Sequence, residues 1–325
     1  MKKNILFSVF LTSVLMARKV VVKMATLAPE GTDVHGMLLE IGQEWKEITK
    51  GSVRLKIYPG GVVGDERDMV RKMRIGQIHA AAITSEGLSE IVPDFAGFFI
   101  PLVFQSFEDI DKVKNALLPE LKVKMKESGF ELLDLSDFGW VHWFSKEIIR
   151  TPEDLKRQKF FTWAGDFRWE EIWNKAGYNP VPLASTDILS GLQTGLINTI
   201  PTMPIYALSQ QSFGIANNML DLRWGVVMAG IIIDSKTWKR ISKKYHDPMI
   251  SVANKILLKN KNINRKLEKQ AIEVMVQNGL KVHVPTKQEI ENWYSEVEKF
   301  RLLIEGNVIP KKTYTKVINL IQNNR

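Results

Sequence analysis

Hydrophobic residues along the first third of the chain alternate between two periods, one typical of strands and one typical of helices. Val20–Thr26 and Val53–Tyr58 are short β-rich runs, and each is followed by turn residues and then by helical spacing over Val34–Ile48 and Glu66–Ile75. Ile78–Thr84 is a compact apolar run of the kind that a buried parallel strand needs. Strands that alternate with helices predict an α/β fold.

A second α/β unit occupies residues 151–204. Thr151 supplies a hydroxyl cap before Pro152, which suits the first position of a helix. The aromatic run Lys159–Trp163 is typical of a strand, and Trp169–Ala176 returns to helical spacing. The pattern therefore predicts a second half with its own strands and helices.

The remaining elements follow from the same two periods. Asp137–Phe144 is expected to cross between the two halves. The other expected elements are a helix over Glu108–Ser128, a strand over Phe130–Leu135, a rigid loop over Thr199–Tyr206, a β-rich segment over Asn218–Ile233, a long helix over Pro248–Gly279 broken around Asn260–Asn264, a strand over Leu280–Val284, a helix over Gln288–Glu305 and a last helix after Pro310.

The composition is that of an ordinary globular protein. A chain of 325 residues is long enough for two domains, and 45% hydrophobic with 25% charged residues does not indicate disorder. The net charge of +9 would favour anionic partners, but the lysines and arginines are spread along the chain. Because no recognition-module signature is present, we expect no nucleic-acid binding.

The N-terminus indicates export. Lys2 and Lys3 precede an apolar run, Ile5–Met16, which is the layout of a signal peptide. Ala17 suits the last position before cleavage, but Leu15 is larger than usual two positions earlier, so an uncleaved N-terminal anchor is the alternative. No other stretch approaches the ~20 apolar residues that span a bilayer. We therefore expect a periplasmic protein.

The residues of a catalytic or metal site are missing from the sequence. The chain has no cysteine, which excludes disulfides, thiolate metal ligands and a lipoprotein anchor. The five histidines are scattered; His35 is expected to act as a capping or surface residue and His142 as a satisfied core residue. There is no paired-histidine motif, nucleophile elbow or Walker loop. We expect neither an enzyme nor a metal or cofactor.

Six segments occur in an order and at a spacing that resemble one known family. They are Lys50–Val53, Tyr58–Gly64, Met73–His79, Ile100–Phe104, Thr151–Lys156 and Gly191–Asn198. Together they resemble the extracytoplasmic solute-binding subunit of TRAP transporters, the DctP-type P proteins. The resemblance covers nearly the whole mature chain.

The resemblance implies a two-lobed periplasmic binding protein fold, type II-like, in which each lobe is a mixed or parallel sheet flanked by helices and a long helix spans both lobes. Residues 1–18 would be the signal peptide or anchor. Lobe I would comprise residues 19–140 and 228–268, and lobe II residues 141–227 and 269–325. A ligand that touches both lobes would close the cleft and present a new surface to the membrane subunits of the transporter.

The chain departs from the family at the positions that bind carboxylates. The family arginine after the Thr-Pro-Glu-Asp-Leu segment corresponds to Phe161, and a second arginine corresponds to Val141. The family asparagine corresponds to Thr202, and an acidic or polar contact to Thr84. A carboxylate that is buried without a cation would be desolvated and unpaired. We therefore expect a hydrophobic or amphipathic ligand.

The expected ligand-binding residues come from both lobes, and for each aromatic one a core position remains open. They are Thr26, Leu27 and Thr84 on the first lobe, and Trp140, Val141, Phe161, Trp163, Thr202 and Trp224 on the second.

A different use of the same fold is the alternative to a receptor. Loss of both arginines could mark a scaffold for protein association, for example with a TPR-type partner, which some branches of the family are thought to use. A continuous apolar cavity between the lobes would favour a receptor. A cleft packed shut by Phe161 and Trp163 would favour the scaffold.

Overall fold

The computed structural model describes residues 19–322. The expected signal peptide or anchor lies outside these residues. Within them, no helix combines the length and the apolar character that crossing a membrane requires.

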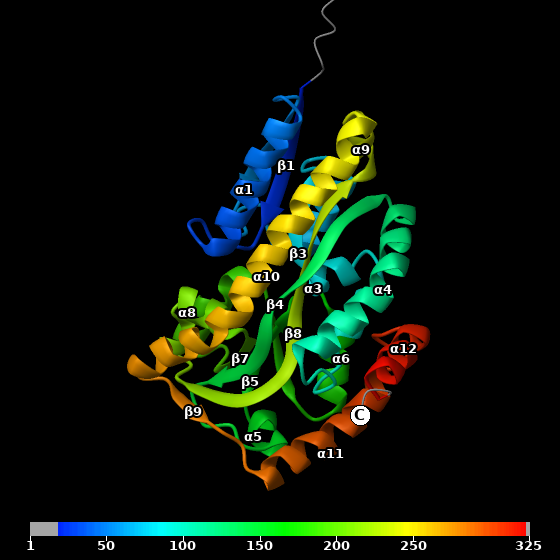
Figure 1. Cartoon of the computed structure of the whole chain (residues 1–325). Helices are drawn as coiled ribbons and strands as arrows, with labels where there is room; N and C mark the ends of the chain where they lie inside the picture. Colours follow the sequence, from blue (N-terminus) through cyan, green and yellow to red (C-terminus); the bar gives the residue numbers. More distant parts are fainter. Residues whose placement is uncertain (1–18, 323–325) are drawn as a thin grey trace, which may run out of the picture.

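One mixed sheet carries the architecture. The strand order is β2-β1-β3-β8-β4-β7-β5-β6, with β9 paired to β8. Two parallel groups, β2-β1-β3 and β7-β5-β6, are joined through the long antiparallel pair β4 and β8, which runs through both halves (Figure 1). The strands are β1 (Val20–Thr26), β2 (Val53–Tyr58), β3 (Ala80–Thr84), β4 (Phe130–Ser145), β5 (Lys159–Trp163), β6 (Asn179–Leu183), β7 (Thr199–Thr202), β8 (Asn218–Asp234) and β9 (Lys281–His283).

Helices cover the sheet, as the alternating sequence pattern predicts. They are α1 (Asp33–Ile48), α2 (Glu66–Arg74), α3 (Ser85–Ser89), α4 (Phe107–Glu127), α5 (Pro152–Lys156), α6 (Phe167–Lys175), α7 (Ile188–Thr194), α8 (Pro204–Ser209), α9 (Ser235–Arg240), α10 (His246–Gln277), α11 (Lys287–Ile304) and α12 (Lys311–Gln322). Short 3-10 turns η1 (Pro93–Phe99), η2 (Ser185–Asp187), η3 (Ser212–Gly214) and η4 (Lys243–Tyr245) connect them.

The 32-residue helix α10 spans both lobes. It packs against α1 on one lobe, against the shared strand β4, and against α8 on the other lobe (Figure 1). The break that we expected around Asn260–Asn264 does not occur. The side-chain amide of Asn260 donates to the carbonyl of Ile256 at 2.9 Å, so it bonds along the helix instead of ending it. The expected long helix is thus confirmed, and its expected interruption is wrong.

Two other expectations change in detail. The segment expected to cross between the lobes is the second half of β4, which pairs with β8 as far as Ser145. The loop expected over Thr199–Tyr206 is instead the strand β7 followed by α8, because Pro204 takes the first turn of that helix, where its missing N–H costs nothing. The prolines of this segment had suggested an irregular loop.

The C-terminal helix lies against elements of the first lobe. α12 packs on α4 and η1, both within the segment assigned to lobe I. Its buried residues Val317 and Ile321 join the same apolar cluster as Phe98. The division of the chain into lobes at the stated residues stays a prediction.

Candidate functional site: a cleft between the lobes

A cavity of about 560 Å³ lies where the carboxyl ends of the strands of the two lobes face each other. The ends of β1 and β3 contribute Thr26 and Thr84, and the ends of β5 and β7 contribute Trp163 and Thr202. Open α/β sheets bind ligands beyond the carboxyl ends of their strands. The sheet topology therefore places this cavity where a ligand site is expected.

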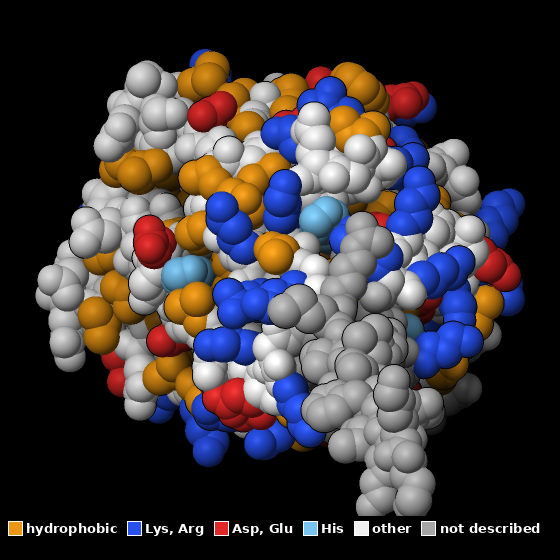
Figure 2. Space-filling view, turned by 90° about the horizontal axis from the view of Figure 1, so that it is seen from above, with side chains coloured by type: hydrophobic (Ala, Val, Ile, Leu, Met, Phe, Trp, Pro, Cys, Tyr) orange, Lys and Arg blue, Asp and Glu red, His pale blue; other side chains and the backbone are white. Residues whose placement is uncertain are grey.

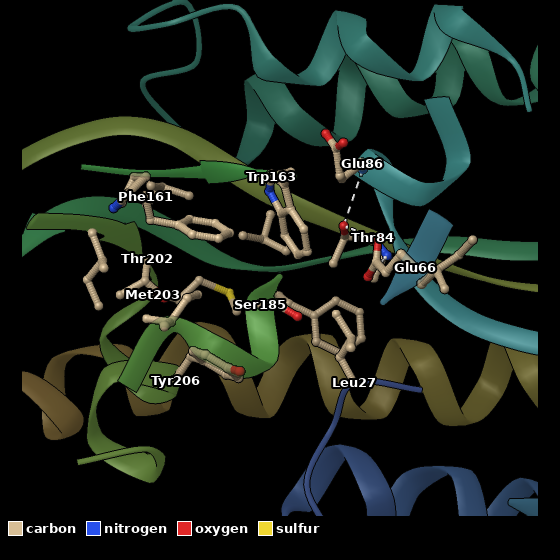
Figure 3. A pocket seen from close by; sticks show the side chains of 18 of the residues that line it. Leu27, Glu66, Thr84, Glu86, Phe161, Trp163, Ser185, Thr202, Met203 and Tyr206 are labelled. Atoms are coloured by element: carbon tan, nitrogen blue, oxygen red, sulfur yellow. Dashed lines mark hydrogen bonds between the residues drawn. The ribbon is translucent and has the colours of Figure 1, made fainter. Parts of the chain in front are cut away.

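The structure brings eight of the nine expected ligand-binding residues to the wall of this cavity. Figure 3 shows the rings of Phe161 and Trp163 pointing into the space that Thr84 and Leu27 approach from the other lobe. The eight residues are Thr26, Leu27, Thr84, Val141, Phe161, Trp163, Thr202 and Trp224. Their contact with a ligand stays a prediction.

Trp140 is the exception. It is fully buried, its ring lies 5.3 Å from that of Phe107 on α4, and the Arg223 guanidinium lies 4.8 Å from its ring centre. Successive side chains of a strand point to opposite faces, and on β4 it is Val141 that faces the cavity. The expectation that Trp140 lines the cleft is therefore corrected. The segment that contains it does reach the cleft, but its side chain lies on the other face of β4.

Tryptophans form a large part of the wall. α6 presents Trp169 and Trp173 on one face, since residues four apart in a helix are neighbours. The Trp224 ring lies 6.1 Å from that of Trp173 and 5.5 Å from that of Trp143. Phe160 lies 5.0 Å from Trp173. The sequence showed this concentration of aromatic residues but could not decide between a core and a cleft position. In the structure these rings are buried in the core and also line the cavity.

Glu66, the first residue of α2, is a buried carboxyl on the cavity wall. It accepts hydrogen bonds from the Thr84 backbone N–H at 2.8 Å, the Thr84 hydroxyl at 2.7 Å and the Gly87 N–H at 2.9 Å (Figure 3). Burial raises its pKa to about 7, although these hydrogen bonds oppose the shift. Nothing in the sequence marked this residue, because α2 has the charge pattern of a solvated helix.

Three further carboxyl groups surround the guanidinium group of Arg67. Its Nη2 lies 2.8 Å from Glu86 and 3.1 Å from Asp166, and its Nη1 contacts Glu90. Glu86 and Asp166 are buried and line the cavity. Burial, together with the charge of Asp166, raises the pKa of Glu86 against the pull of Arg67. Arg168 Nε also lies 3.8 Å from Asp166 Oδ1, so three carboxyl groups meet two guanidinium groups at this end of the cavity.

No Lys, Arg or His is among the described residues that line the cavity. Phe161 and Val141, the positions where the resemblance predicted arginines in relatives, both face it as apolar side chains. The remaining polar wall consists of hydroxyl and amide groups, such as those of Ser185, Tyr206 and Gln210. Burial and the charges of Asp65 and Glu66 raise the pKa of Tyr206, so its phenol stays neutral.

The histidines lie in structural positions. His35 Nδ1 accepts from the Gly31 N–H at 3.2 Å, as expected of a capping residue. His142 is buried as expected, with Nδ1 at 3.3 Å from the Leu220 carbonyl, but the expectation that it is satisfied is only half met: Nε2, 3.6 Å from the Glu268 carboxylate, makes no hydrogen bond to the described residues. Among residues 19–322, no group of three or more His, Asp or Glu side chains could hold a metal ion.

Comparisons with known proteins agree with this geometry. Residues 24–301 match the family model of bacterial extracellular solute-binding protein, family 7 (DctP). A solute-binding protein of Roseobacter denitrificans is 22% identical over 257 residues, and the 2,3-diketo-L-gulonate-binding periplasmic protein of Escherichia coli is 23% identical over 244 residues. These matches cover 74% and 73% of this chain, and the same shares of the two relatives.

A solved structure shows the same fold. The sugar acid binding protein DctPAm of Advenella mimigardefordensis, in complex with galactonate, superposes with a TM-score of 0.87 at 13% identity. The superposition covers 95% of this chain and 99% of that one. The expected two-lobed mixed α/β fold is thereby confirmed.

Proposed function

Because the chain belongs to the DctP family of bacterial extracellular solute-binding proteins, we propose that it is the periplasmic receptor of a TRAP-type transporter and that its cleft takes an apolar or amphipathic ligand. The ligand would enter between the lobes and stabilise the closed form by touching both. The closed form would then dock on the membrane subunits of the transporter.

The observation that carries the ligand class is the composition of the cavity wall. The named relative from Escherichia coli binds 2,3-diketo-L-gulonate and the Advenella protein holds galactonate, and both ligands are acids. In this chain, no Lys, Arg or His of the described residues lines the cavity. A carboxylate there would lose its hydration without gaining a counter-charge. Each aromatic ring covered by an apolar ligand would instead contribute ~2 kcal/mol.

An open cavity also favours the receptor over the scaffold. Phe161 and Trp163 stand 5.3 Å apart, ring to ring, on the wall of the cavity and leave its volume of about 560 Å³ unfilled. A receptor fold kept only to associate with a TPR-type partner would have no need for this volume. Family membership likewise supports a binding role over catalysis.

The test is mass spectrometry of protein purified under native conditions and then denatured. A hydrophobic or amphipathic compound released in proportion to protein would support the proposal. A stoichiometric sugar acid or dicarboxylate would overturn the ligand class, because cations outside the lining would then have to pair with it. A matched sample of the Phe161→Arg variant serves as control, since it should lose an apolar compound.

A further inference from the structure

Resting on the proposed receptor function, we propose that the natural ligand carries a positively charged ammonium group on an apolar body. Two separate features of the cavity lead to this inference: the tryptophans of its wall and the sign of its ionisable groups.

The first feature is the aromatic wall. Trp143, Trp163, Trp169, Trp173 and Trp224 all line the cavity. Indole faces carry partial negative charge and attract organic cations within about 6 Å, most strongly when water is excluded. An aromatic wall also accepts the hydrocarbon part of the ligand. One chemical class, an apolar ammonium ion, satisfies both properties.

The second feature is that every described Asp, Glu, Lys, Arg or His residue on the cavity wall is a carboxyl. These are Glu66, Glu86 and Asp166. Arg67 lies behind them, and its guanidinium is shared among Glu86, Asp166 and Glu90. Arg168 Nε lies 3.8 Å from Asp166 Oδ1, so two guanidinium groups lie near these carboxyls. Burial raises the pKa of Glu66 and of Glu86. A positive charge placed beside these two wall carboxyls would favour their ionised forms and be attracted by them, whereas an added negative charge would be repelled.

Asp166 is the residue best placed to balance the ligand charge. Only 2% of its side chain is exposed, it lines the cavity, and its Oδ2 accepts no hydrogen bond although it lies 3.1 Å from Arg67 Nη2. Its Oδ1 accepts from the Trp169 N–H at 3.3 Å and so caps α6. The same residue therefore joins the acidic group to the helix that carries two of the wall tryptophans.

Three probe molecules that share a phenylbutyl group and differ only in their polar end distinguish the effect of ligand charge from that of apolar contact. Calorimetric titration at pH 7.5 would use 4-phenylbutylamine, 4-phenylbutanoate and 4-phenylbutan-1-ol on protein freed of co-purified compounds by dialysis. The amine should bind at least tenfold more tightly than the alcohol, and the acid most weakly. Equal binding of amine and alcohol would overturn the ammonium group while leaving an apolar receptor in place. Tighter binding of the acid would overturn both proposals.

Asp166→Asn is the matched variant. Asparagine caps a helix nearly as well as aspartate, so α6 should be preserved, while the charge is lost. The preference for amine over alcohol should fall about tenfold with alcohol binding unchanged. Glu171→Gln, on the exposed side of the same helix, should leave the preference intact. An unchanged preference in Asp166→Asn, or binding of none of the three probes to the parent protein, would count against the ammonium ligand.

Discussion

At Glu66, burial and hydrogen bonding act in opposite directions on one carboxyl. Three donors from Thr84 and Gly87 favour the charged form, yet the pKa is raised to about 7 because the group is removed from water. The folded protein therefore holds a proton at a pH where the unfolded chain, with an ordinary pKa of 4.5, has released it.

This difference predicts a pH dependence of stability. A folded-state pKa above the unfolded one means that the free energy of unfolding is highest below pH 4.5 as far as Glu66 is concerned, falls as the pH rises, and levels off above pH 7. The contribution is about 3 kcal/mol. Urea unfolding at pH 5 and pH 8 should show that the free energy of unfolding decreases less between these pH values in Glu66→Gln than in the parent protein. Glu273→Gln, on an exposed face of α10, is the control. An equal fall in parent and Glu66→Gln proteins would contradict this assignment.

Phe161 tests the apolar wall. Phe161→Arg would place a cation where the resemblance predicts one in relatives and would remove a ring from the cavity, so binding of 4-phenylbutylamine should weaken by more than tenfold in calorimetric titration. The same substitution at Phe167, of which 75% is exposed, should have no effect. Unchanged binding in Phe161→Arg would remove Phe161 from the site.

At the scale of elements, the hydrophobic pattern predicted most boundaries. Val20–Thr26, Val53–Tyr58 and Lys159–Trp163 are strands with the expected ends, since each is a dense β-branched or aromatic run between turn residues. The pattern fails to predict the structure where the same side chain is compatible with two backbone conformations. Asn260 can break a helix or bond within it, and only packing of α10 across both lobes decides.

The same limit applies to the site. Resemblance and strand ends located Thr26, Thr84 and Phe161, because these depend on chain order. The face of Trp140 depends on the register of β4, which contains irregularities near Gly139 and Trp143. The burial of Asp166 depends on Arg67 from the other lobe, about a hundred residues away in sequence. Contacts of that kind leave no periodic signal.

Arg265 is the residue through which α10 holds the shared strand. Its Nε and Nη2 donate to both oxygens of the buried Asp137 on β4, at 2.9 and 2.8 Å, and it also pairs with Asp111 on α4. A bidentate pair of this kind is geometrically specific. It fixes the helix against β4 and α4.

Removal of Arg265 should therefore be costly. Arg265→Met leaves Asp137 buried with only Lys261, at 3.9 Å, as a counter-charge, and should lower the free energy of unfolding by about 3 kcal/mol. Denaturant unfolding measures this, with Lys269→Met on the solvent side of α10 as control. Adding Asp137→Asn to Arg265→Met should recover part of the loss. A cost below that of Lys269→Met would show that the pair does not hold the helix.

At the scale of the whole molecule, the two lobes touch directly beside the cavity. Asp65, which caps α2 in the first lobe, accepts from the Ser185 N–H of the second lobe at 2.8 Å, and Arg67 pairs with Asp166. Leu27 and Ser185, both labelled in Figure 3, line the cavity as well. On the face of the molecule drawn in Figure 2, Lys and Arg side chains are dispersed among hydrophobic and acidic ones. These two contacts hold the segments on either side of the cavity together without a ligand.

Such contacts should raise ligand affinity without touching the ligand, because a receptor that spends more time closed loses less free energy on closing. Asp65→Asn isolates this effect. One oxygen of asparagine can still cap α2 through the Glu66 N–H, but its amide would face the Ser185 N–H, donor against donor.

We expect Asp65→Asn to weaken ligand binding about tenfold, since a hydrogen bond to a charged group contributes about 1.5–3 kcal/mol. The thermal stability should change little, and small-angle scattering of the ligand-free protein should show a larger radius of gyration than that of the parent. Asp68→Asn, at an exposed position of the same helix, should change neither quantity. Weaker binding without a change in the radius would place Asp65 in the ligand site, whereas unchanged affinity with a larger radius would mean that closure does not limit binding.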